Sequence, residues 1–226
     1  MPQESRKQAV AVHRSAEPMT AAYVEPQRRR AQTSRLADSL AFLSGFMARP
    51  LEVASVVPSS VFLEQRVVRA ADLGHARCVV ELGPGTGGTT RAMLRAMAPH
   101  ARLLAVELNA TFSARLRRRI DDTRLIVQAG RAEALAEHLA QWSLPAPDVV
   151  VSGIPFSTLP PEAARQVAAA VESCLAPGGR VVAYQLRPHV ATYFARHLGE
   201  PGQHWEWRNV PPMRVFRWVK PFAAGR

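Results

Sequence analysis

The sequence predicts an α/β protein in which a doubly wound, mostly parallel sheet carries helices on both faces. Apolar runs of strand length alternate with helical patterns from Arg77 onward, the order that produces parallel βαβ units. A glycine-rich turn follows the first run, as expected where a ligand meets the carboxyl end of a strand. Two short alternating segments near the end indicate an antiparallel edge. The 226 residues suffice for one core with a small N-terminal extension.

The N-terminal part differs from the rest. Residues 1–34 are polar, mixed in charge and without periodicity, so we expect a flexible basic segment. Residues 35–72 are expected to form N-terminal amphipathic helices, the first ended by Pro50 and the second capped by Ser59 or Ser60. The apolar face of the first helix comes from residues at helical spacing: Leu36, Leu40, Leu43 and Met47.

Residues 73–226 are expected to form one ligand-binding domain. The predicted parallel strands are 78–82, 103–106, 124–128, 148–151 and 181–184. The predicted helices between and after them are 88–97, 110–119, 131–140, 161–175 and 189–198. Segments 205–208 and 215–218, on either side of a Pro-Pro pair, are expected to form the antiparallel edge.

Charge and cysteine content limit the partners. The net charge of +11, from 29 basic and 18 acidic residues, would attract nucleic acid or an anionic membrane. Arginines 28–30 and the acid-free tail after Glu206 either flank one anionic surface or are ordinary solvated faces.

Cys78 and Cys174 lack metal-ligand spacing, so we expect reduced thiols and no metal. Without a membrane-length apolar run or a signal peptide, a cytoplasmic monomer is expected.

The turn after the first strand predicts a cofactor site. Glu81 stands two residues before the glycines Gly83, Gly85 and Gly87, in the pattern E-x-G-x-G-x-G that is typical of S-adenosylmethionine-dependent methyltransferases. Glu107 ends the next apolar run, where a carboxylate suits two ribose hydroxyls. The glycines, together with Gly88, also fit the dinucleotide pattern G-x-G-x-x-G, so a nicotinamide enzyme is the alternative. We favour S-adenosylmethionine because a carboxylate beside the turn suits an ammonium and disfavours a pyrophosphate.

The fourth strand runs into a segment that predicts an acceptor site, Ser152-Gly153-Ile154-Pro155-Phe156. It resembles the loop N-[IL]-P-[FY] of amino-group methyltransferases, in which carbonyl groups and an aromatic face hold the accepting nitrogen. The alternative is a proline turn with Phe156 packed inward. RNA adenine dimethylases share this loop, but Gly153 stands where they have asparagine, and glycine lacks the amide that suits an adenine amino group.

From about Phe42 to Lys220 the chain resembles the bacterial phospholipid N-methyltransferases, which convert phosphatidylethanolamine stepwise to phosphatidylcholine. The narrowest matching segments are Val151-Ser152-Gly153-Ile154-Pro155 and Arg208-Asn209-Val210-Pro211-Pro212. The resemblance implies a Rossmann-like methyltransferase domain, an amino-phospholipid acceptor, and an N-terminal helix that docks on anionic membrane at the inner face. It also assigns further contacts. The expected cofactor-binding residues are Ser60, Glu81, Gly83, Gly85, Thr86, Gly87, Glu107, Leu108, Ala132, Glu133, Ser152 and Gly153. Ile154 and Pro155 are expected at the acceptor.

Two departures from the family pattern keep other acceptors open. The family has G-D-A after the third strand where this chain has Gly130-Arg131-Ala132, so either Glu133 or the backbone alone holds the adenine. The fifth strand ends in Tyr184-Gln185-Leu186 instead of Q-[FY]-T-Y. An ornithine lipid, a small amine and, less favoured, ribosomal RNA adenine therefore remain alternatives, and a sensor or scaffold role is disfavoured by the intact cofactor residues.

The predicted chemistry is an in-line attack of nitrogen on a sulfonium methyl, driven mainly by positioning and desolvation. An aliphatic ammonium, with a pKa of about 10 like that of lysine, must first lose a proton. Tyr184, His189 or a bound water is the candidate base, and Phe156 the candidate aromatic wall. Arg187 or Arg214 is a candidate partner for the lipid phosphate.

Overall fold

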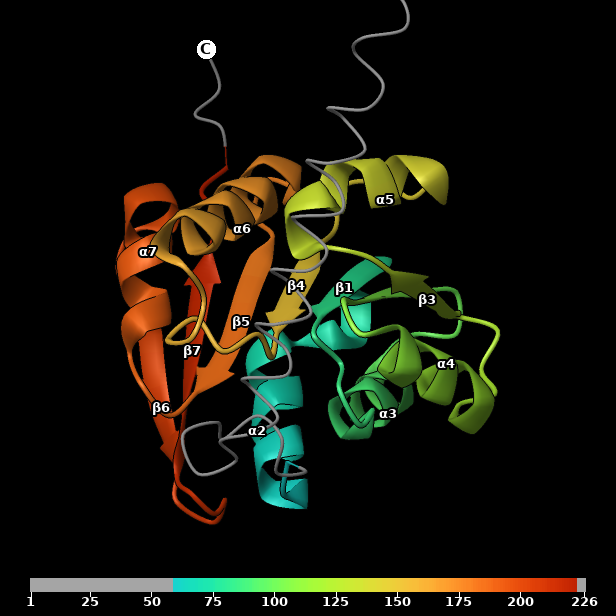
Figure 1. Ribbon diagram of the computed structural model, residues 1–226, viewed down its shortest axis with the longest axis horizontal. Helices are drawn as coiled ribbons and strands as arrows, with labels where there is room; N and C mark the ends of the chain where they lie inside the picture. Colours follow the sequence, from blue (N-terminus) through green and yellow to red (C-terminus); the bar gives the residue numbers. More distant parts are fainter. Residues whose placement is uncertain (1–58, 223–226) are drawn as a thin grey trace, which may run out of the picture. The chain divides into compact units, whose positions relative to one another are not determined.

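The computed structural model describes residues 59–222 and shows a seven-stranded sheet between two layers of helices (Figure 1). The strand order is β3-β2-β1-β4-β5-β7-β6. Strands β1 to β5 pair in parallel, whereas β7 is antiparallel to both β5 and β6. The predicted fold class is therefore confirmed. Segment 1–34, which the sequence predicts to be flexible, and the amphipathic helix that it predicts before Pro50 lie outside the described residues.

The strands follow the predicted apolar runs closely. They are β1 (Cys78–Leu82), β2 (Arg102–Glu107), β3 (Leu125–Ala129), β4 (Val149–Ser152), β5 (Arg180–Gln185), β6 (Gly202–Glu206) and β7 (Met213–Val219). All five residues of β1 are buried, as expected for a central parallel strand covered on both faces. Val80 lies beside Leu104 of β2 and Val150 of β4, and this register brings the carboxyl ends of the three strands to one edge.

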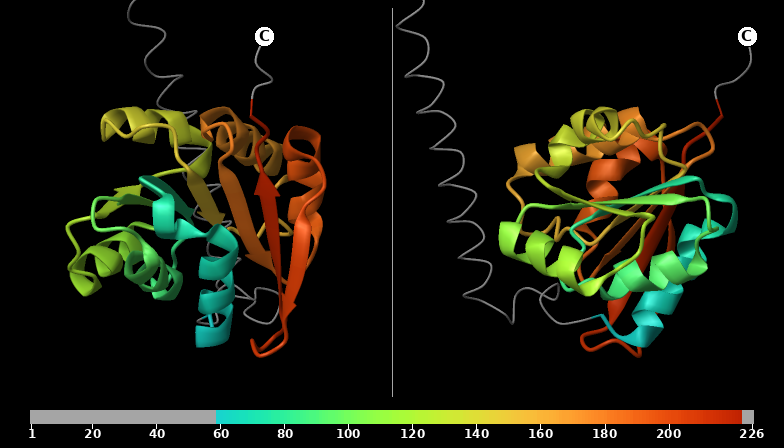
Figure 2. Two further views of the ribbon diagram at one scale, coloured as in Figure 1. Left: turned by 180° about the vertical axis from the view of Figure 1, so that it is seen from behind. Right: turned by 90° about the vertical axis from the view of Figure 1, so that its right-hand side faces the viewer.

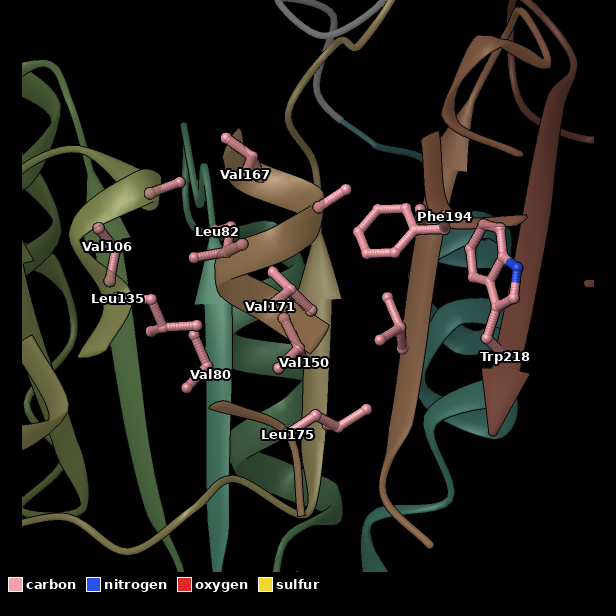
Figure 3. Packing of buried hydrophobic residues seen from close by; sticks show 14 of the residues in the cluster. Val80, Leu82, Val106, Leu135, Val150, Val167, Val171, Leu175, Phe194 and Trp218 are labelled. Carbon is pink, nitrogen blue, oxygen red and sulfur yellow. The ribbon is translucent and has the colours of Figure 1, made fainter. Parts of the chain in front are cut away.

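Helices cover both faces of the sheet, which the right-hand view of Figure 2 shows edge-on. They are α2 (Val61–Ala71), α3 (Gly88–Ala96), α4 (Ala110–Arg119), α5 (Leu135–Gln141), α6 (Pro161–Cys174) and α7 (His189–Leu198). Helices α5, α6 and α7 pack against alternate residues of β1, β4 and β7, such as Val80, Val150 and Trp218 (Figure 3). The residues between these, including Val79 and Val149, pack against α2 and α3.

Most predicted elements differ from the structure by one or two residues at an end, and two differ more. The helix predicted over 131–140 is divided into a 3-10 turn (Ala132–Ala134) and α5. Strand β6 ends at Glu206, and the predicted strand residues Trp207 and Arg208 lie in the turn before β7. The Glu206 carboxylate closes this turn, because it accepts a hydrogen bond from the backbone amide of Arg208 at 3.1 Å. No helix within residues 59–222 is long and apolar enough to cross a bilayer.

Candidate active site

A cavity opens at the edge where β1, β4 and β5 end. The glycine turn after β1 and the loop after β4 line two of its sides. The end of β5 and the residues after it line a third, and Ser59 and Asn209 complete the wall. Seen in Figure 1, the start of α2 and the turn between β6 and β7 reach beyond the lower tips of β4 and β5. The site is therefore built from both ends of the described chain.

The glycine turn has the backbone conformation that its sequence predicts. Gly83, Gly85 and Gly87 have φ values of 74°, 53° and 84°, in the region that favours glycine. A Cβ atom on Gly85 would meet nothing within 4 Å, so the backbone here faces open space that a ligand can enter closely. Thr86 is exposed and also lines the cavity.

Glu107 is held rigidly at the end of β2. Its Oε1 accepts a hydrogen bond from the Asn109 amide at 2.9 Å, and its Oε2 accepts one from the Gly85 amide at 3.2 Å. Burial raises the pKa of Glu107, and hydrogen bonds from backbone amides, that of Leu108 among them, oppose this. Each carboxylate oxygen has two lone pairs, so the group keeps acceptor capacity for two ribose hydroxyls. The residues fit the cofactor that the sequence predicts.

Glu81 lies beneath the glycine turn and is fully buried. Its Oε2 accepts a hydrogen bond from Thr90 Oγ1 at 2.6 Å, whereas its Oε1 has no hydrogen-bond partner within residues 59–222. Burial raises the pKa of Glu81 to about 8, the Thr90 hydroxyl lowers it, and the nearby Glu107 and Glu64 raise it further. An unpaired, buried carboxyl oxygen is a fitting acceptor for the ammonium of a methionine-like ligand.

The side predicted to hold adenine is less complete. Leu108 follows Glu107 and is 42% exposed, so its side chain is free to cover a flat ring. Ala132 is buried. Glu133 forms an ion pair with Arg131, between Oε1 and Nη2 at 2.6 Å. Adenine recognition by the Glu133 carboxylate would have to compete with this guanidinium, which favours recognition by the backbone.

The loop after β4 is fixed by hydrogen bonds on both sides. The Gly153 amide donates to the carbonyl oxygen of Leu82 at 2.9 Å. Gln185 Nε2 donates to the Ile154 carbonyl at 2.7 Å, while Gln185 Oε1 is buried without a partner in the described part of the chain. Ser152 Oγ accepts from the Ile154 amide at 3.4 Å. Of the predicted acceptor residues, Pro155 lines the cavity directly.

Phe156 does not form the aromatic wall predicted for the acceptor. Its side chain is 1% exposed, and its ring centroid lies 5.7 Å from that of Phe194 and 5.9 Å from that of Tyr193. The inward-packed alternative is therefore correct, because α7 offers the ring an apolar surface that the cavity does not.

The two candidate bases lie in different surroundings. Tyr184 lines the cavity, and its hydroxyl accepts a hydrogen bond from Thr89 Oγ1 at 3.4 Å. Burial, followed by the charge of Glu81, raises the pKa of Tyr184 above its ordinary value, so its hydroxyl stays protonated at neutral pH. His189 begins α7 and is exposed to solvent. These positions favour Tyr184 as a hydrogen-bonding group and leave proton removal to water or the lipid.

The predicted arginines and Ser60 also differ in their placement. Arg187 is exposed and lines the cavity. Arg214 lies over the Trp205 ring at 4.5 Å, and its Nε is buried without a partner among the described residues. Ser60 caps α2, where its Oγ accepts from the Leu63 amide, so this side chain supports the wall and does not face a ligand.

The sequence analysis missed two residues of the site. Asn209 is 4% exposed, accepts a hydrogen bond from the Ser60 amide at 2.9 Å and lines the cavity. Gln185 fixes the loop after β4. Both belong to motifs quoted above, but their partners lie far away in the sequence, so no local pattern reveals their role.

Comparison with known proteins agrees with this geometry. The family model described as a methyltransferase domain matches residues 79–179. The ornithine lipid N-methyltransferase of Singulisphaera acidiphila is 32% identical over 181 residues, which cover 79% of this chain and 94% of that protein. The ribosomal RNA small subunit methyltransferase A of Laribacter hongkongensis is 32% identical over 100 residues, 44% of this chain and 36% of that protein.

Solved structures share the fold. The N-methyltransferase NodS from Bradyrhizobium japonicum, in complex with S-adenosyl-L-homocysteine, has a TM-score of 0.58 at 19% identity, covering 72% of this chain and 89% of that chain. The O-methyltransferase TomG from Streptomyces achromogenes, in complex with S-adenosylmethionine, has a TM-score of 0.57 at 17% identity, covering 80% and 89%.

Proposed function

Because this chain belongs to the class I S-adenosylmethionine-dependent N-methyltransferases, in one family with an ornithine lipid N-methyltransferase, we propose that it methylates the amino group of a membrane amino lipid. The match covers 94% of that lipid enzyme and 79% of this chain, which supports this acceptor class. The ribosomal RNA enzyme of Laribacter hongkongensis matches less than half of this chain. A match of that extent is expected from a shared cofactor-binding domain alone.

S-adenosylmethionine supplies an electrophilic methyl group on a sulfonium, and the chain's own residues position the reactants. Glu107 and the backbone at Gly85 would hold the ribose side, and the unpaired oxygen of Glu81 would hold the ammonium. The loop after β4 brings Gly153 and Pro155 to the cavity, and Gln185 keeps that loop in place through the Ile154 carbonyl. Oriented carbonyl dipoles stabilise a nitrogen that becomes cationic as it is methylated.

One observation carries the choice of an alkyl amine over adenine. A Cβ atom on Gly153 would lie 2.6 Å from the Tyr184 hydroxyl oxygen and 2.9 Å from the Gly83 carbonyl oxygen. No side chain fits at position 153 while Tyr184 keeps its place, so the amide that would recognise adenine has no room here. The Tyr184 hydroxyl occupies that space, which supports an amine on a flexible chain as the acceptor.

The acceptor is expected to carry an anionic group beside its amine. Arg187 at the cavity wall is available to bind it, whereas Arg214 does not line the cavity and its unpaired Nε is buried. The carboxylate of an ornithine lipid and the phosphate of phosphatidylethanolamine both satisfy this requirement. The relative of known activity supports ornithine lipid, and the segments around Gly153 and Asn209 support phosphatidylethanolamine converted towards phosphatidylcholine.

The test is methyl transfer from labelled S-adenosylmethionine to purified ornithine lipid, phosphatidylethanolamine and ribosomal RNA in parallel, with products identified by mass spectrometry. The proposal requires label in an amino lipid, and the lipid that is methylated decides between the two acceptors. Label in RNA alone would refute the proposal. Glu107→Ala serves as the inactive control because the carboxylate at the ribose is lost.

We further propose that the enzyme works as a peripheral protein at the cytoplasmic face of an anionic membrane. The apolar face of residues 36–47 and the arginines before it support this. Deleting the residues before Pro50 should then release the protein from anionic vesicles and leave the remaining domain folded. Unchanged vesicle binding by the truncated protein would show that another surface of the protein contacts the membrane.

A further inference from the structure

We propose that the mouth of the cavity is itself a membrane-docking surface, made by the start of α2, the turn between β6 and β7, and the segment after β5. This inference rests on the proposed lipid acceptor. We call it the rim surface and define it by its exposed apolar residues and one cation: Val61, Phe62, Leu186, Trp207, Val210 and Arg208. Its occupant is the headgroup boundary of an anionic bilayer.

Five of the nine large apolar side chains that are exposed within residues 59–222 lie at this edge. Val210 is 81% exposed, Trp207 67%, Val61 63%, Phe62 42% and Leu186 38%. Each lies on a segment that also contributes to the cavity wall, through Ser59, Leu186 or Asn209. Figures 1 and 2 show the start of α2 and the β6–β7 turn side by side at the end of the molecule where β4 and β5 terminate. A bilayer at this face would meet the cavity mouth directly.

The rim surface is held on a fixed scaffold, although its side chains are exposed. The Ser60 amide donates to Asn209 Oδ1 at 2.9 Å, which ties α2 to the turn. The Arg208 guanidinium lies over the Phe62 ring at 4.2 Å. Trp207 stacks on Trp205 with centroids 4.8 Å apart. A rigid presentation lowers the entropy lost when these side chains enter the interface.

Charge complementarity points to an anionic partner. The carboxylate of Glu206, the acid nearest the turn, is neutralised by Arg66 at 2.8 Å and by Arg208 at 3.0 Å. Arg69 and Arg217 line a groove beside Arg66 on the same side of α2, and neither has an ion-pair partner within residues 59–222. Asp72 in the same groove is paired with Arg180. The surface from the turn along α2 therefore carries an excess of positive charge, which attracts anionic headgroups.

The composition of the rim surface favours a bilayer over a nucleic acid. An exposed tryptophan beside aliphatic residues and arginines is the set found where proteins enter the headgroup region. Val61, Leu186 and Val210 offer no ring on which a base could stack. A lipid whose headgroup enters the cavity must also keep its acyl chains in the bilayer, so the apolar residues at the mouth have a direct use.

The experiment compares the full-length chain with its Trp207→Ser/Val61→Ser variant and with Trp142→Ser as the matched control. Trp142 is 43% exposed, but it follows α5 and precedes the amino end of β4, at the opposite edge of the sheet. Binding to vesicles of phosphatidylcholine with phosphatidylglycerol is measured by sedimentation. Cofactor affinity is measured by calorimetry, and methyl transfer to the amino lipid is measured in vesicles and in detergent micelles.

We expect the double variant to bind vesicles roughly tenfold more weakly, since two exposed apolar side chains no longer enter the interface. Its KM for vesicle lipid should rise, with kcat, cofactor affinity and transfer in micelles unchanged, and Trp142→Ser should behave as wild type. Vesicle binding of the double variant equal to that of the wild type would overturn the rim surface. If the proposed function is wrong, the wild-type protein will methylate no amino lipid even in micelles. That result is distinguishable from a failure of the rim surface, which is seen in vesicle binding.

Discussion

The substitution Glu81→Gln should stabilise the cofactor-free protein at alkaline pH and weaken cofactor binding at the same time. Glu81 is fully buried, and burial raises its pKa to about 8 from an ordinary value of 4.5. Between these two values the folded state keeps the proton that the unfolded state has released. The stability that a raised carboxyl pKa gives at low pH is therefore lost as pH rises.

The size of the effect follows from the two pKa values. Each pKa unit corresponds to about 1.4 kcal/mol, so between about pH 5 and about pH 8 this one group costs the wild-type protein roughly 3 to 4 kcal/mol of stability. A glutamine keeps the acceptor for the Thr90 hydroxyl and never ionises, so the variant should lack this part of the pH dependence. It should bind S-adenosylmethionine roughly ten- to a hundredfold more weakly, because a glutamine cannot release a proton on binding and so cannot form the charge-assisted hydrogen bond to the ammonium.

The assay is urea unfolding of wild type and variant, without cofactor, across this pH range, followed by calorimetric titration with S-adenosylmethionine. Glu200→Gln, at an exposed position after α7, is the control and should leave both quantities unchanged. If Glu81→Gln showed the same pH dependence of the free energy of unfolding as wild type, the assignment of a buried, protonated Glu81 would be refuted.

Three further predictions concern the other parts of the site. Glu107→Ala should abolish detectable cofactor binding in calorimetry while circular dichroism shows a folded domain; wild-type affinity would refute the ribose assignment. Gly153→Ala should lower the free energy of unfolding by about 1 to 3 kcal/mol through overpacking, and Tyr184→Phe should recover part of this loss in a double-mutant cycle; strictly additive effects would show that the two positions do not meet. Cys78, whose pKa is raised by burial and by Asp148 to about 11, should resist a thiol reagent under native conditions, whereas Cys174 reacts first; equal rates in mass spectrometry would contradict the packing.

The fold could be predicted because its signals are local. The run Cys78–Leu82 and the helix Ala110–Arg119 have the predicted bounds, since a buried parallel strand and an amphipathic helix each leave a periodic pattern in their own residues. The turn after Glu206 was missed because Trp207 and Arg208 continue the alternation of the strand. A side-chain hydrogen bond from Arg208 to Glu206, which no periodicity records, ends it there.

The acceptor side of the site was less predictable because its residues depend on distant partners. Glu81 and Glu107 were found from a motif, as were the glycines between them. Phe156 was given a role at the acceptor because its motif allows one, but α7 buries it, and the contacts with α7 are long-range. Gln185 acts through the Ile154 carbonyl, 31 residues earlier in the chain, so its role appears only in the folded protein.

The two halves of the site also differ in when they come into existence during synthesis. The contact between Gly85 and Glu107 spans 22 residues, so it forms soon after β2 leaves the ribosome. The contacts of α2 with the last turn span 149 residues at Ser60 and Asn209 and 140 residues at Arg66 and Glu206. A nascent chain therefore acquires its cofactor-binding half early, while the entrance for the acceptor is completed only when nearly the whole chain has been made. An incomplete chain that is released early would be able to bind the cofactor. It would lack the entrance through which a lipid reaches the methyl group.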